Sequence, residues 1–232
     1  MTHTSPKLEW TDGVPVAQAF DDPYYSLADG EHETRHVFLT GNDLPQRFCP
    51  GFHIAELGFG TGLNCLVALC AWRAAKSEGR LHFTSFERYP MTLEDMRLAH
   101  AGFAGVPIVA EPILAQLEHG WEVVTDELTL TVVVGDARET LPNWVGKADA
   151  WFLDGFSPAK NPELWEPQLL SEVARHTNAG GTFATYTAAG AVRRALSDAG
   201  FEVERVPGYG RKRHMPKGRL SRRSNRRALG SL

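Results

Sequence analysis

Four acidic residues stand where an alternation of strands and helices would bring them to one edge of a sheet. Glu56 begins a glycine-rich segment, and Glu87, Asp136 and Asp154 each follow an apolar run. The carboxyl ends of parallel strands share one edge of a sheet, and ligands bind there. Carboxylates at that edge can accept hydrogen bonds from the hydroxyl or amino groups of a ligand, and one of them can orient an amine and accept its proton.

The glycine-rich segment, Glu56 to Asn64, reads Glu-Leu-Gly-Phe-Gly-Thr-Gly-Leu-Asn and predicts a cofactor site. Glycines permit a tight turn and let a ligand lie against the backbone, while the following helix offers unpaired N–H groups. A dinucleotide fingerprint requires Gly or Ala where Leu63 stands, and a P-loop is excluded because no Gly-Lys-Ser/Thr follows. The remaining pattern, acid-x-Gly-x-Gly-x-Gly, is typical of class I S-adenosylmethionine-dependent methyltransferases. The alternative is a tight strand-to-helix connection that binds nothing.

Glu87 and Asp136 stand where they can bind the ribose and the base of a nucleoside. Glu87 ends the second core strand, where a carboxylate can hold the two hydroxyls of a ribose. Asp136 ends the third core strand, where a carboxylate can accept a hydrogen bond from an exocyclic adenine amine. Each residue has an alternative interpretation when taken singly: Glu87 as a surface acid, and Asp136 as a helix N-cap or turn residue.

Asp154 begins the segment Asp-Gly-Phe-Ser-Pro-Ala-Lys-Asn-Pro, which ends at Pro162. An acid followed by a rigid loop rich in proline and aromatic residues suits a methyl-acceptor site beside the sulfonium of the cofactor. Its carboxylate can orient an amine and accept its proton, so Asp154 is the candidate catalytic residue. The alternative is that Asp154 caps the next helix. Phe156 either stacks on a base or fills the loop, and Lys160 and Asn161 contact either substrate or solvent.

Apolar strands and amphipathic helices alternate from residue 52 to residue 206. The pattern predicts an α/β protein with a Rossmann-like class I methyltransferase fold, in which helices cover both faces of a mainly parallel sheet. Residues 1–50 are rich in turn formers, show no sustained helical period and are expected to form a cap with short strands. We expect strands at 52–57, 81–87, 122–124, 129–134, 148–153, 182–187 and 201–206, and helices at 61–76, 93–101, 113–117, 164–176 and 189–199.

Composition indicates a globular protein of one α/β domain. The chain has 232 residues, of which 43% are hydrophobic and 22% charged, and this length needs neither disulfides nor a structural metal for stability. No apolar run approaches the roughly 20 residues of a membrane span and no signal peptide is recognisable, so we predict a soluble cytoplasmic protein without a membrane partner. The cysteines and histidines lack the spacing of a metal site, and no metal is expected.

Charge is distributed unevenly along the chain. The net charge of −4 combines −13 over residues 1–210 with +9 between Arg211 and Arg227. A basic segment of this kind either holds an anionic polymer through its phosphates or only keeps the end of the chain in solution.

Several segments carry a resemblance to a known family. Two of them are residues 58–64 of the glycine-rich segment and residues 151–162 around Asp154. The others are Phe-Asp-Asp-Pro-Tyr-Tyr-Ser at 20–26, Glu-Thr-Arg-His-Val-Phe-Leu at 33–39, Ser-Phe-Glu at 85–87 and Gly-Tyr-Gly-Arg-Lys-Arg at 208–213. From about Trp10 to Met215 the chain resembles the tRNA 5-methylaminomethyl-2-thiouridine methyltransferases. These occur alone or as the N-terminal half of a bifunctional wobble-uridine enzyme.

The resemblance implies transfer of a methyl group from S-adenosylmethionine to the 5-aminomethyl amine of a wobble uridine in the anticodon loop of tRNA. Oxidoreductase activity is not expected of this chain, so a separate FAD-dependent oxidoreductase or an aminomethyl-producing enzyme is an expected partner. The resemblance implies Asp154 as the catalytic residue, Glu56, Gly58, Gly60, Gly62, Asn64, Glu87 and Asp136 for the cofactor, and Tyr25, Ser26, Arg35, Phe156, Lys160 and Asn161 for the substrate.

We divide the chain into an N-terminal cap at 1–50, a methyltransferase core at 51–210 and a basic C-terminal tail at 211–232. The chain departs from the family at its end, because Pro216 is expected to cut short the last strand and residues 221–232 match nothing in the family. Two alternative functions remain at this stage: methylation of a different amine, in a small molecule or another RNA, and a non-catalytic module that binds S-adenosylmethionine and RNA.

Overall fold

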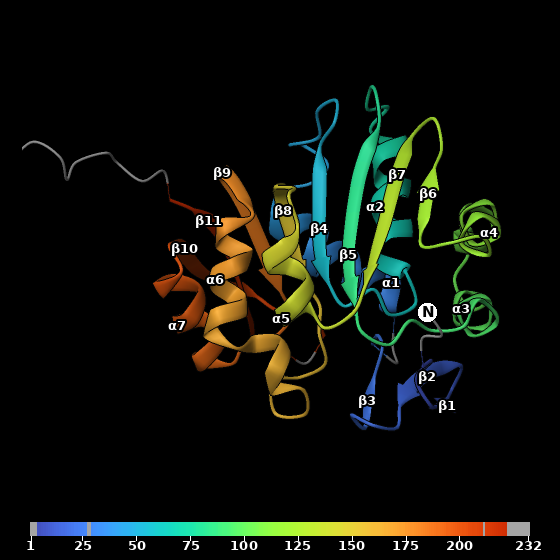
Figure 1. Cartoon of the computed structure of the whole chain (residues 1–232), viewed down its shortest axis with the longest axis horizontal. Coiled ribbons are helices and arrows are strands. Elements are labelled where there is room, and N and C mark those ends of the chain that lie inside the picture. Colours follow the sequence, from blue (N-terminus) through green and yellow to red (C-terminus); the bar gives the residue numbers. More distant parts are fainter. Residues whose placement is uncertain (1–3, 27–28, 211, 222–232) are drawn as a thin grey trace, which may run out of the picture.

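An eight-stranded mixed sheet forms the centre of the molecule (Figure 1). The computed structural model describes residues 4–26, 29–210 and 212–221. The strand order is β10-β11-β9-β8-β4-β5-β7-β6; the five strands from β9 to β7 are parallel, whereas β6 and β11 run antiparallel to their neighbours. The strands are β4 (His53–Leu57), β5 (Leu81–Glu87), β6 (Glu122–Val124), β7 (Leu128–Val134), β8 (Ala148–Leu153), β9 (Thr177–Thr185), β10 (Phe201–Pro207) and β11 (His214–Leu220).

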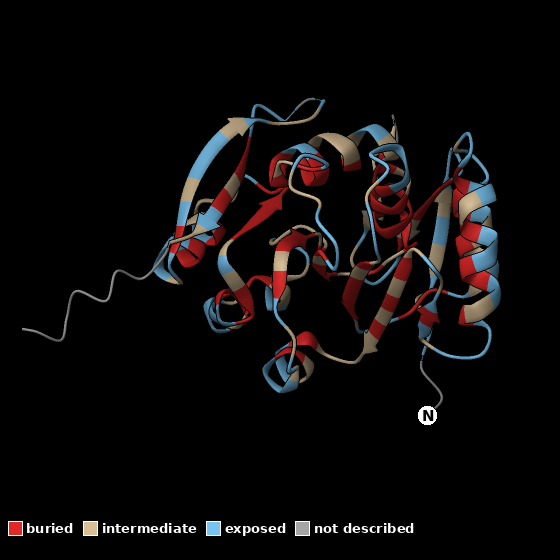
Figure 2. Ribbon diagram, turned by 90° about the horizontal axis from the view of Figure 1, so that it is seen from above, coloured by how far each residue is buried: buried red, intermediate tan, exposed pale blue. Residues whose placement is uncertain are grey.

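The central parallel strands are largely buried on both faces, because apolar residues occupy positions that point to either face of the sheet. Successive side chains of a strand point to opposite faces, so in β8 Ala150 and Phe152 join one hydrophobic cluster while Trp151 and Leu153 join the other. Figure 2 shows these central strands as buried and the outward sides of the peripheral helices as largely exposed. One cluster includes α2 (Leu63–Ala74), α3 (Leu93–His100) and α4 (Val106–Leu117), and the other α5 (Ala137–Thr140), α6 (Pro167–Arg175) and α7 (Gly190–Asp198).

The winding of the sheet reverses between β4 and β8, which are parallel neighbours. From β4 the chain continues outward through β5 and β7, and from β8 it continues in the other direction through β9. Connections that leave two adjacent strands in opposite directions open a crevice at their carboxyl ends. Backbone bonds tie this edge together, since Asp154 donates its N–H to the carbonyl of Leu57 (3.1 Å) and Gly58 to that of Phe86 (2.9 Å).

The N-terminal residues lie across the carboxyl ends of the central strands (Figure 1). They form a three-stranded antiparallel sheet of β1 (Leu8–Thr11), β2 (Val14–Ala17) and β3 (Asp22–Pro23). The expectation of no helix in this region was wrong, because α1 (Gly30–Thr34) continues through a π-helical turn, η1 (Arg35–Leu39), into a 3-10 turn, η2 (Thr40–Asn42). Residues 37–39 are consecutive and all buried, so the alternation of polar and apolar positions that identifies a helix is missing there.

The C-terminal part of the described chain differs from expectation. Pro216 does not end the last strand, and residues 214–220, expected in a tail, form β11 between β10 and β9. Pro216 pairs with Arg205 of β10, whereas pairing with β9 begins only at Lys217. The proline that lacks an N–H therefore stands before the ladder with β9. The predicted tail residues 211 and 222–232 lie outside the described residues.

Other boundaries differ where proline or glycine obscures the pattern. The helix expected at 113–117 is the end of α4, whose residues Pro107 and Pro112 hide its length. The helix expected at 164–176 divides into a 3-10 turn, η4 (Pro162–Trp165), and α6, which begins at Pro167. The strand expected at 182–187 is β9, which starts at Thr177; a further 3-10 turn, η3 (Leu141–Asn143), follows α5. No helix within the described ranges is both long and apolar enough to cross a membrane.

Candidate active site

A cavity of about 1350 Å³ lies at the carboxyl ends of the parallel strands. Pockets for one small ligand usually measure ~300–1,000 Å³, so this one has room for a cofactor and part of a second ligand. The glycine-rich turn, the strand ends, the N-terminal segment and the turn between β10 and β11 all contribute to its wall. Ten predicted site residues line it: Tyr25, Ser26, Gly58, Gly60, Asn64, Glu87, Asp136, Asp154, Phe156 and Asn161.

The glycine-rich turn is built so that only glycine fits. Gly58, Gly60 and Gly62 have φ values of +91°, +53° and +77°, a region that other L-residues rarely adopt. A Cβ atom at Gly58 would lie 2.6 Å from the carbonyl oxygen of Asp154. The turn therefore presses its backbone against the Asp154 segment and leaves the backbone of Gly58 and Gly60 open to the cavity. Gly62 is the N-cap of α2 and does not line the cavity.

Glu87 is held by backbone donors at the end of β5. Its Oε2 accepts the N–H of Gly60 at 3.1 Å, and its Oε1 accepts that of Tyr89 at 2.7 Å. Burial raises the pKa of Glu87, and these backbone bonds act in the opposite direction. Each carboxylate oxygen can accept a further hydrogen bond, and the residue lines the cavity. Glu87 can therefore receive hydroxyl groups there.

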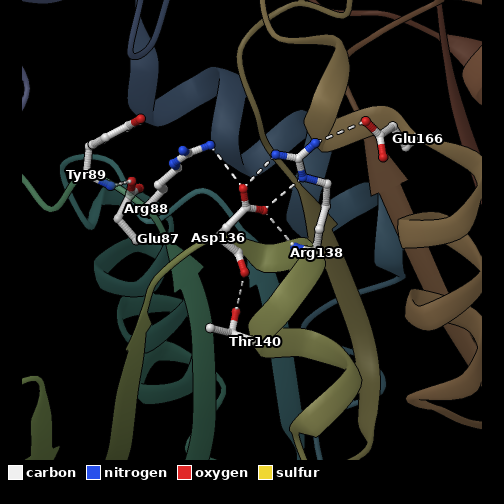
Figure 3. Close-up of polar contacts among 7 residues, drawn as sticks. All are labelled: Glu87, Arg88, Tyr89, Asp136, Arg138, Thr140 and Glu166. Atoms are coloured by element: carbon white, nitrogen blue, oxygen red, sulfur yellow. Dashed lines mark hydrogen bonds and ion pairs between the residues drawn. The ribbon is translucent and has the colours of Figure 1, made fainter.

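Asp136 is engaged by two arginines (Figure 3). Its Oδ1 accepts the backbone N–H and Nε of Arg138, and its Oδ2 accepts Arg138 Nη2 at 2.7 Å and Arg88 Nη1 at 3.0 Å. These bonds, chiefly that from the Arg138 side chain, lower the pKa of Asp136. Asp136 is the N-cap of α5, so the capping interpretation applies to its side chain. Contact between Asp136 and an adenine amine stays a prediction.

Glu56 lies behind the cavity wall and does not line it, contrary to the expectation that it contacts the cofactor. The fully buried carboxylate accepts Ser85 Oγ at 2.6 Å and Asn64 Nδ2 at 2.9 Å. Burial raises the pKa of Glu56 well above its ordinary value. Asn64 Nδ2 also donates to Asp154 Oδ2 at 2.6 Å, and Asn64 Oδ1 accepts Thr34 Oγ1 at 2.8 Å. Glu56 is therefore joined by hydrogen bonds to the cavity wall through Asn64.

Asp154 follows β8 at the centre of the cavity edge. Burial raises the pKa of Asp154 to about 7, with a smaller opposing effect from the hydrogen bond of Asn64. Both protonation states are thus populated near neutral pH, as a group that exchanges protons requires. The alternative interpretation as a helix cap was wrong, because the following η4 and α6 have Asn161 and Glu166 as their N-caps.

The loop after Asp154 packs against the N-terminal segment. The ring of Phe156 stacks on Phe20 with centroids 4.7 Å apart and meets Tyr24 edge-on at 5.0 Å. Lys160 does not line the cavity; its Nζ contacts the backbone oxygen of Asp21 and lies 3.1 Å from the carboxylate of the same residue. The lysine therefore anchors the loop to the N-terminal segment, and the expected contact of Lys160 with substrate has no support.

Of the predicted substrate residues in the N-terminal segment, two line the cavity and one does not. Tyr25 and Ser26 line the cavity, and Tyr25 Oη donates to the carbonyl of Ala99 at 2.9 Å. Arg35 does not line it, because its guanidinium pairs with Glu31 one helical turn away at 2.8 Å. A direct contact between Arg35 and substrate therefore stays a prediction.

Among the cavity residues that were not predicted as site residues, Glu33, Tyr186 and Lys212 lie together. Lys212 Nζ lies 3.2 Å from Glu33 Oε1 and 3.9 Å from the centroid of the Tyr186 ring. Glu33 and Lys212 belong to segments that carry the family resemblance, but only the folded chain shows that they meet. Tyr186 stands beyond the last residue of β9 and has no sequence signal of its own. Over the described residues, no group of three or more His, Cys, Asp or Glu side chains could hold a metal ion.

Comparisons with known proteins agree with this geometry. Residues 109–221 match a family model described as S-adenosyl-L-methionine-dependent methyltransferase. The chain is 46% identical to the tRNA 5-methylaminomethyl-2-thiouridine biosynthesis bifunctional protein MnmC of Chromobacterium violaceum, over 94% of this chain and 35% of that protein. The chain is related to the MnmC proteins. The MnmC of Stutzerimonas stutzeri is 45% identical over 92% of this chain and 34% of its own length.

The relationship to MnmC extends to a solved structure. MNMC2 of Aquifex aeolicus superimposes with a TM-score of 0.77 at 27% identity, covering 94% of this chain and 71% of that one. These matches confirm the resemblance, the Rossmann-like class I fold and the S-adenosylmethionine cofactor predicted from the sequence. The chain spans about a third of the length of the MnmC proteins it matches.

Proposed function

We propose that this chain methylates the amine of 5-aminomethyl-2-thiouridine at the wobble position of tRNA, giving 5-methylaminomethyl-2-thiouridine. The observation that carries the proposal is the Asp154 carboxylate, half-buried at the reversal point of the sheet and facing a cavity with room for a cofactor and part of a second ligand. A tRNA substrate places the enzyme in the cytoplasm. The separate oxidoreductase partner expected from the sequence has no support, because the MnmC relatives are named as single bifunctional proteins.

The residues present fit S-adenosylmethionine as the methyl donor. Gly58 and Gly60 expose backbone to the cavity without a Cβ atom, and Glu87 can accept hydrogen bonds from ribose hydroxyls. The first turn of α2 follows directly and offers the free N–H groups of a helix start. The bound cofactor supplies a methyl group made electrophilic by a sulfonium.

Asp154 supplies the chemistry on the acceptor side. An amine similar to that of Lys is mostly protonated at neutral pH, with a pKa of about 10.4. The Asp154 carboxylate can accept a hydrogen bond from the protonated amine and take one of its protons. The neutral nitrogen then has a lone pair that can attack the methyl carbon, and Asp154 carries the proton that the nitrogen has lost. A pKa near 7 suits this exchange, because general bases act best when their pKa is close to the working pH.

Nucleoside mass spectrometry tests the proposal. Transfer RNA that carries 5-aminomethyl-2-thiouridine is incubated with the protein and S-adenosylmethionine, and we expect the gain of one methyl group on that nucleoside. Asp154→Ala should lose roughly 10²–10⁴-fold in rate, the usual contribution of a general base, while calorimetry shows cofactor binding retained. Asp126→Asn, a change at an exposed acid, is the control and should keep the rate. If Asp154→Ala lost cofactor binding too, its role would be structural or cofactor-binding.

The same assay separates the alternative functions. Methylation of the free nucleoside as efficiently as the tRNA would favour a small-amine methyltransferase. Binding of the cofactor without methylation of any tRNA would favour a non-catalytic module. The half-buried Asp154 on the cavity wall argues for catalysis, since a binding module has no need of a carboxyl with a pKa near 7.

A further inference from the structure

We infer that Glu33 and the ring face of Tyr186 form the receptor for the ammonium group of the acceptor, and that Lys212 fills this receptor until the acceptor displaces it. We call Glu33 and Tyr186 the ammonium receptor. The inference rests on the proposed function and goes beyond it, because it names the residues that select an amine as the methyl acceptor.

The ammonium receptor already holds a primary ammonium, that of Lys212. Its Nζ lies 3.2 Å from Glu33 Oε1 and 3.9 Å from the centre of the Tyr186 ring. A carboxylate supplies charge-assisted hydrogen bonding, and an aromatic face attracts a cation within about 6 Å of its centroid. A 5-aminomethyl group ends in the same –CH₂–NH₃⁺ unit as a lysine side chain. The receptor therefore suits the acceptor chemically as well as it suits Lys212.

Other bonds hold the ammonium receptor in place without Lys212. Glu33 Oε2 accepts the N–H of Ser26 at 3.1 Å, and Tyr186 Oη donates to the carbonyl of Gly155 at 2.8 Å. Each group is thus oriented by a backbone partner of its own. Displacement of Lys212 leaves both groups aimed at the same point, so the receptor is preorganised for a second ammonium.

The ammonium receptor and Asp154 face the same cavity. Glu33, Tyr186, Lys212 and Asp154 all line it, and Gly155, which holds Tyr186, is the residue after Asp154. The charges of Glu33 and Lys212 act on Asp154 in opposite directions, the first raising and the second lowering its pKa. An ammonium bound by Glu33 consequently enters the same cavity as the group that we propose as the proton acceptor.

Lys212 is suited to leave the receptor. It stands in the turn between β10 and β11, and its side chain is 43% exposed whereas that of Glu33 is 16% exposed. Its flexible four-carbon stem lets the ammonium swing to another partner. An RNA acceptor brings an amine for Glu33 and a phosphate for Lys212, so both ion pairs are replaced as they break. A free nucleoside offers no phosphate and has to displace Lys212 without this compensation.

Calorimetry with two nucleosides tests the receptor directly. The probes are 5-aminomethyl-2-thiouridine and its neutral analogue 5-hydroxymethyl-2-thiouridine, titrated with S-adenosylhomocysteine present. We expect the wild-type protein to prefer the amine, and Glu33→Gln to reduce that preference roughly 10-fold or more, as loss of a charged hydrogen-bond partner implies. Lys212→Met should bind the amine at least severalfold more tightly than the wild type and methylate the free nucleoside faster.

Matched control variants distinguish a specific effect on the amine preference from a general loss of structure. Glu31→Gln changes a carboxylate on the same helix that pairs with Arg35 and does not line the cavity, so it should keep the preference. Tyr186→Phe retains the ring face and should keep most of it, whereas Tyr186→Leu should not. Unchanged affinity for S-adenosylhomocysteine shows that a variant is folded. If Glu33→Gln fails this check, the exposed Lys212→Met still decides the question.

The outcomes separate the inference from the proposed function. If the wild-type protein methylates tRNA but Glu33→Gln keeps the amine preference, or Lys212→Met binds the amine more weakly, the receptor is overturned and the function stands. If no tRNA is methylated while the amine preference depends on Glu33, the function is overturned and the receptor stands. A wild-type protein that binds the two nucleosides equally, or neither of them, overturns the receptor.

Discussion

At the scale of single residues, the site depends on a line of polar side chains that ends at Asp154. Ser85 donates to Glu56, Asn64 donates to Glu56, and the same Asn64 nitrogen donates to Asp154. A buried carboxyl and a cavity carboxyl are thus joined through one amide. The protonation of Asp154 depends on this amide as well as on burial.

The pH dependence of the rate follows from the raised pKa of Asp154. The pKa of Asp154 is about 7, so at a pH below this value the carboxyl is mostly protonated and cannot accept a proton. At a higher pH the carboxylate is present and can act as the base. The acceptor amine also titrates, so the informative quantity is the ratio of kcat/KM for the wild type to that for Asp154→Asn. We expect this ratio to rise about tenfold per pH unit up to ~7 and to level off above. A ratio that levels off near pH 4 would contradict the raised pKa.

Replacement of Asn64 should move the break in the pH profile, which is the pH at which this ratio levels off. Asn64→Leu removes the hydrogen bond that lowers the pKa of Asp154, so the break in the pH profile shifts to higher pH. It also leaves buried Glu56 without one donor, which costs about 1–3 kcal/mol in the free energy of unfolding. Thr34→Val is the matched control, because Thr34 bonds to Asn64 but to neither carboxyl; its pH profile should stay in place. An unchanged break in the pH profile of Asn64→Leu would mean that Asn64 does not influence the pKa of Asp154.

At the scale of elements, the reversal of winding between β4 and β8 decides where the site forms. The glycine turn after β4 and the Asp154 segment after β8 lie backbone to backbone. The contact is so close that a Cβ atom added at Gly58 would clash with the backbone of Asp154. The short N-terminal strands and α1 then close the cavity from the side of the strand ends (Figure 1).

Two glycine substitutions should separate backbone strain from crowding. Gly13 and Gly58 have similar φ values, +81° and +91°, but a Cβ atom at Gly13 meets nothing within 4 Å. Gly13→Ala should lower the free energy of unfolding by about 1–2 kcal/mol, the cost of the left-handed region. Gly58→Ala should cost ~1–3 kcal/mol more, since it also pushes against Asp154, and should reduce the rate. Urea denaturation measures both; equal losses would mean that the turn yields easily.

The sequence predicts the elements of this site better than its contacts. Glu87, Asp136 and Asp154 stand at strand ends as predicted, because strands with apolar residues on both faces and glycine at their ends are local patterns. The helical segment 30–39 was not predicted, because Val37-Phe38-Leu39 shows no alternation of polar and apolar residues. The strand β11 was not predicted, because a proline at position 216 is expected to end a strand. The roles of Glu56 as a buried support and of Asp136 as an arginine-bound cap depend on tertiary neighbours that periodicity does not reveal.

At the scale of the whole molecule, charge separates along the chain. Residues 1–210 carry −13, and nine Lys or Arg residues stand between 211 and 227. Of these, Lys212, Lys217 and Arg219 pair in part with acids of the fold, among them Glu33 and Asp43. An RNA polyanion should therefore compete with internal partners for some of these cations.

Salt dependence should report this competition. If about three basic residues contact phosphates, the logarithm of the tRNA affinity falls against that of the salt concentration with a slope of roughly −2 to −3. Replacement of the four arginines at 222, 223, 226 and 227 by glutamine should flatten the slope. Lys147→Gln, a change at an exposed lysine that does not line the cavity, is the control. An unchanged slope after the four replacements would place the phosphate contacts elsewhere on the protein.

The bond between Glu33 and Lys212 joins residues 179 positions apart, and this spacing has a consequence for synthesis on the ribosome. Chains grow at ~5–20 residues per second, so Glu33 emerges roughly 10–40 s before its partner. During that interval the central strands and the glycine turn can assemble, but the acceptor side of the cavity lacks the lysine that covers it. The ion pair between Glu33 and Lys212 is therefore among the last contacts of the cavity that the nascent protein can form.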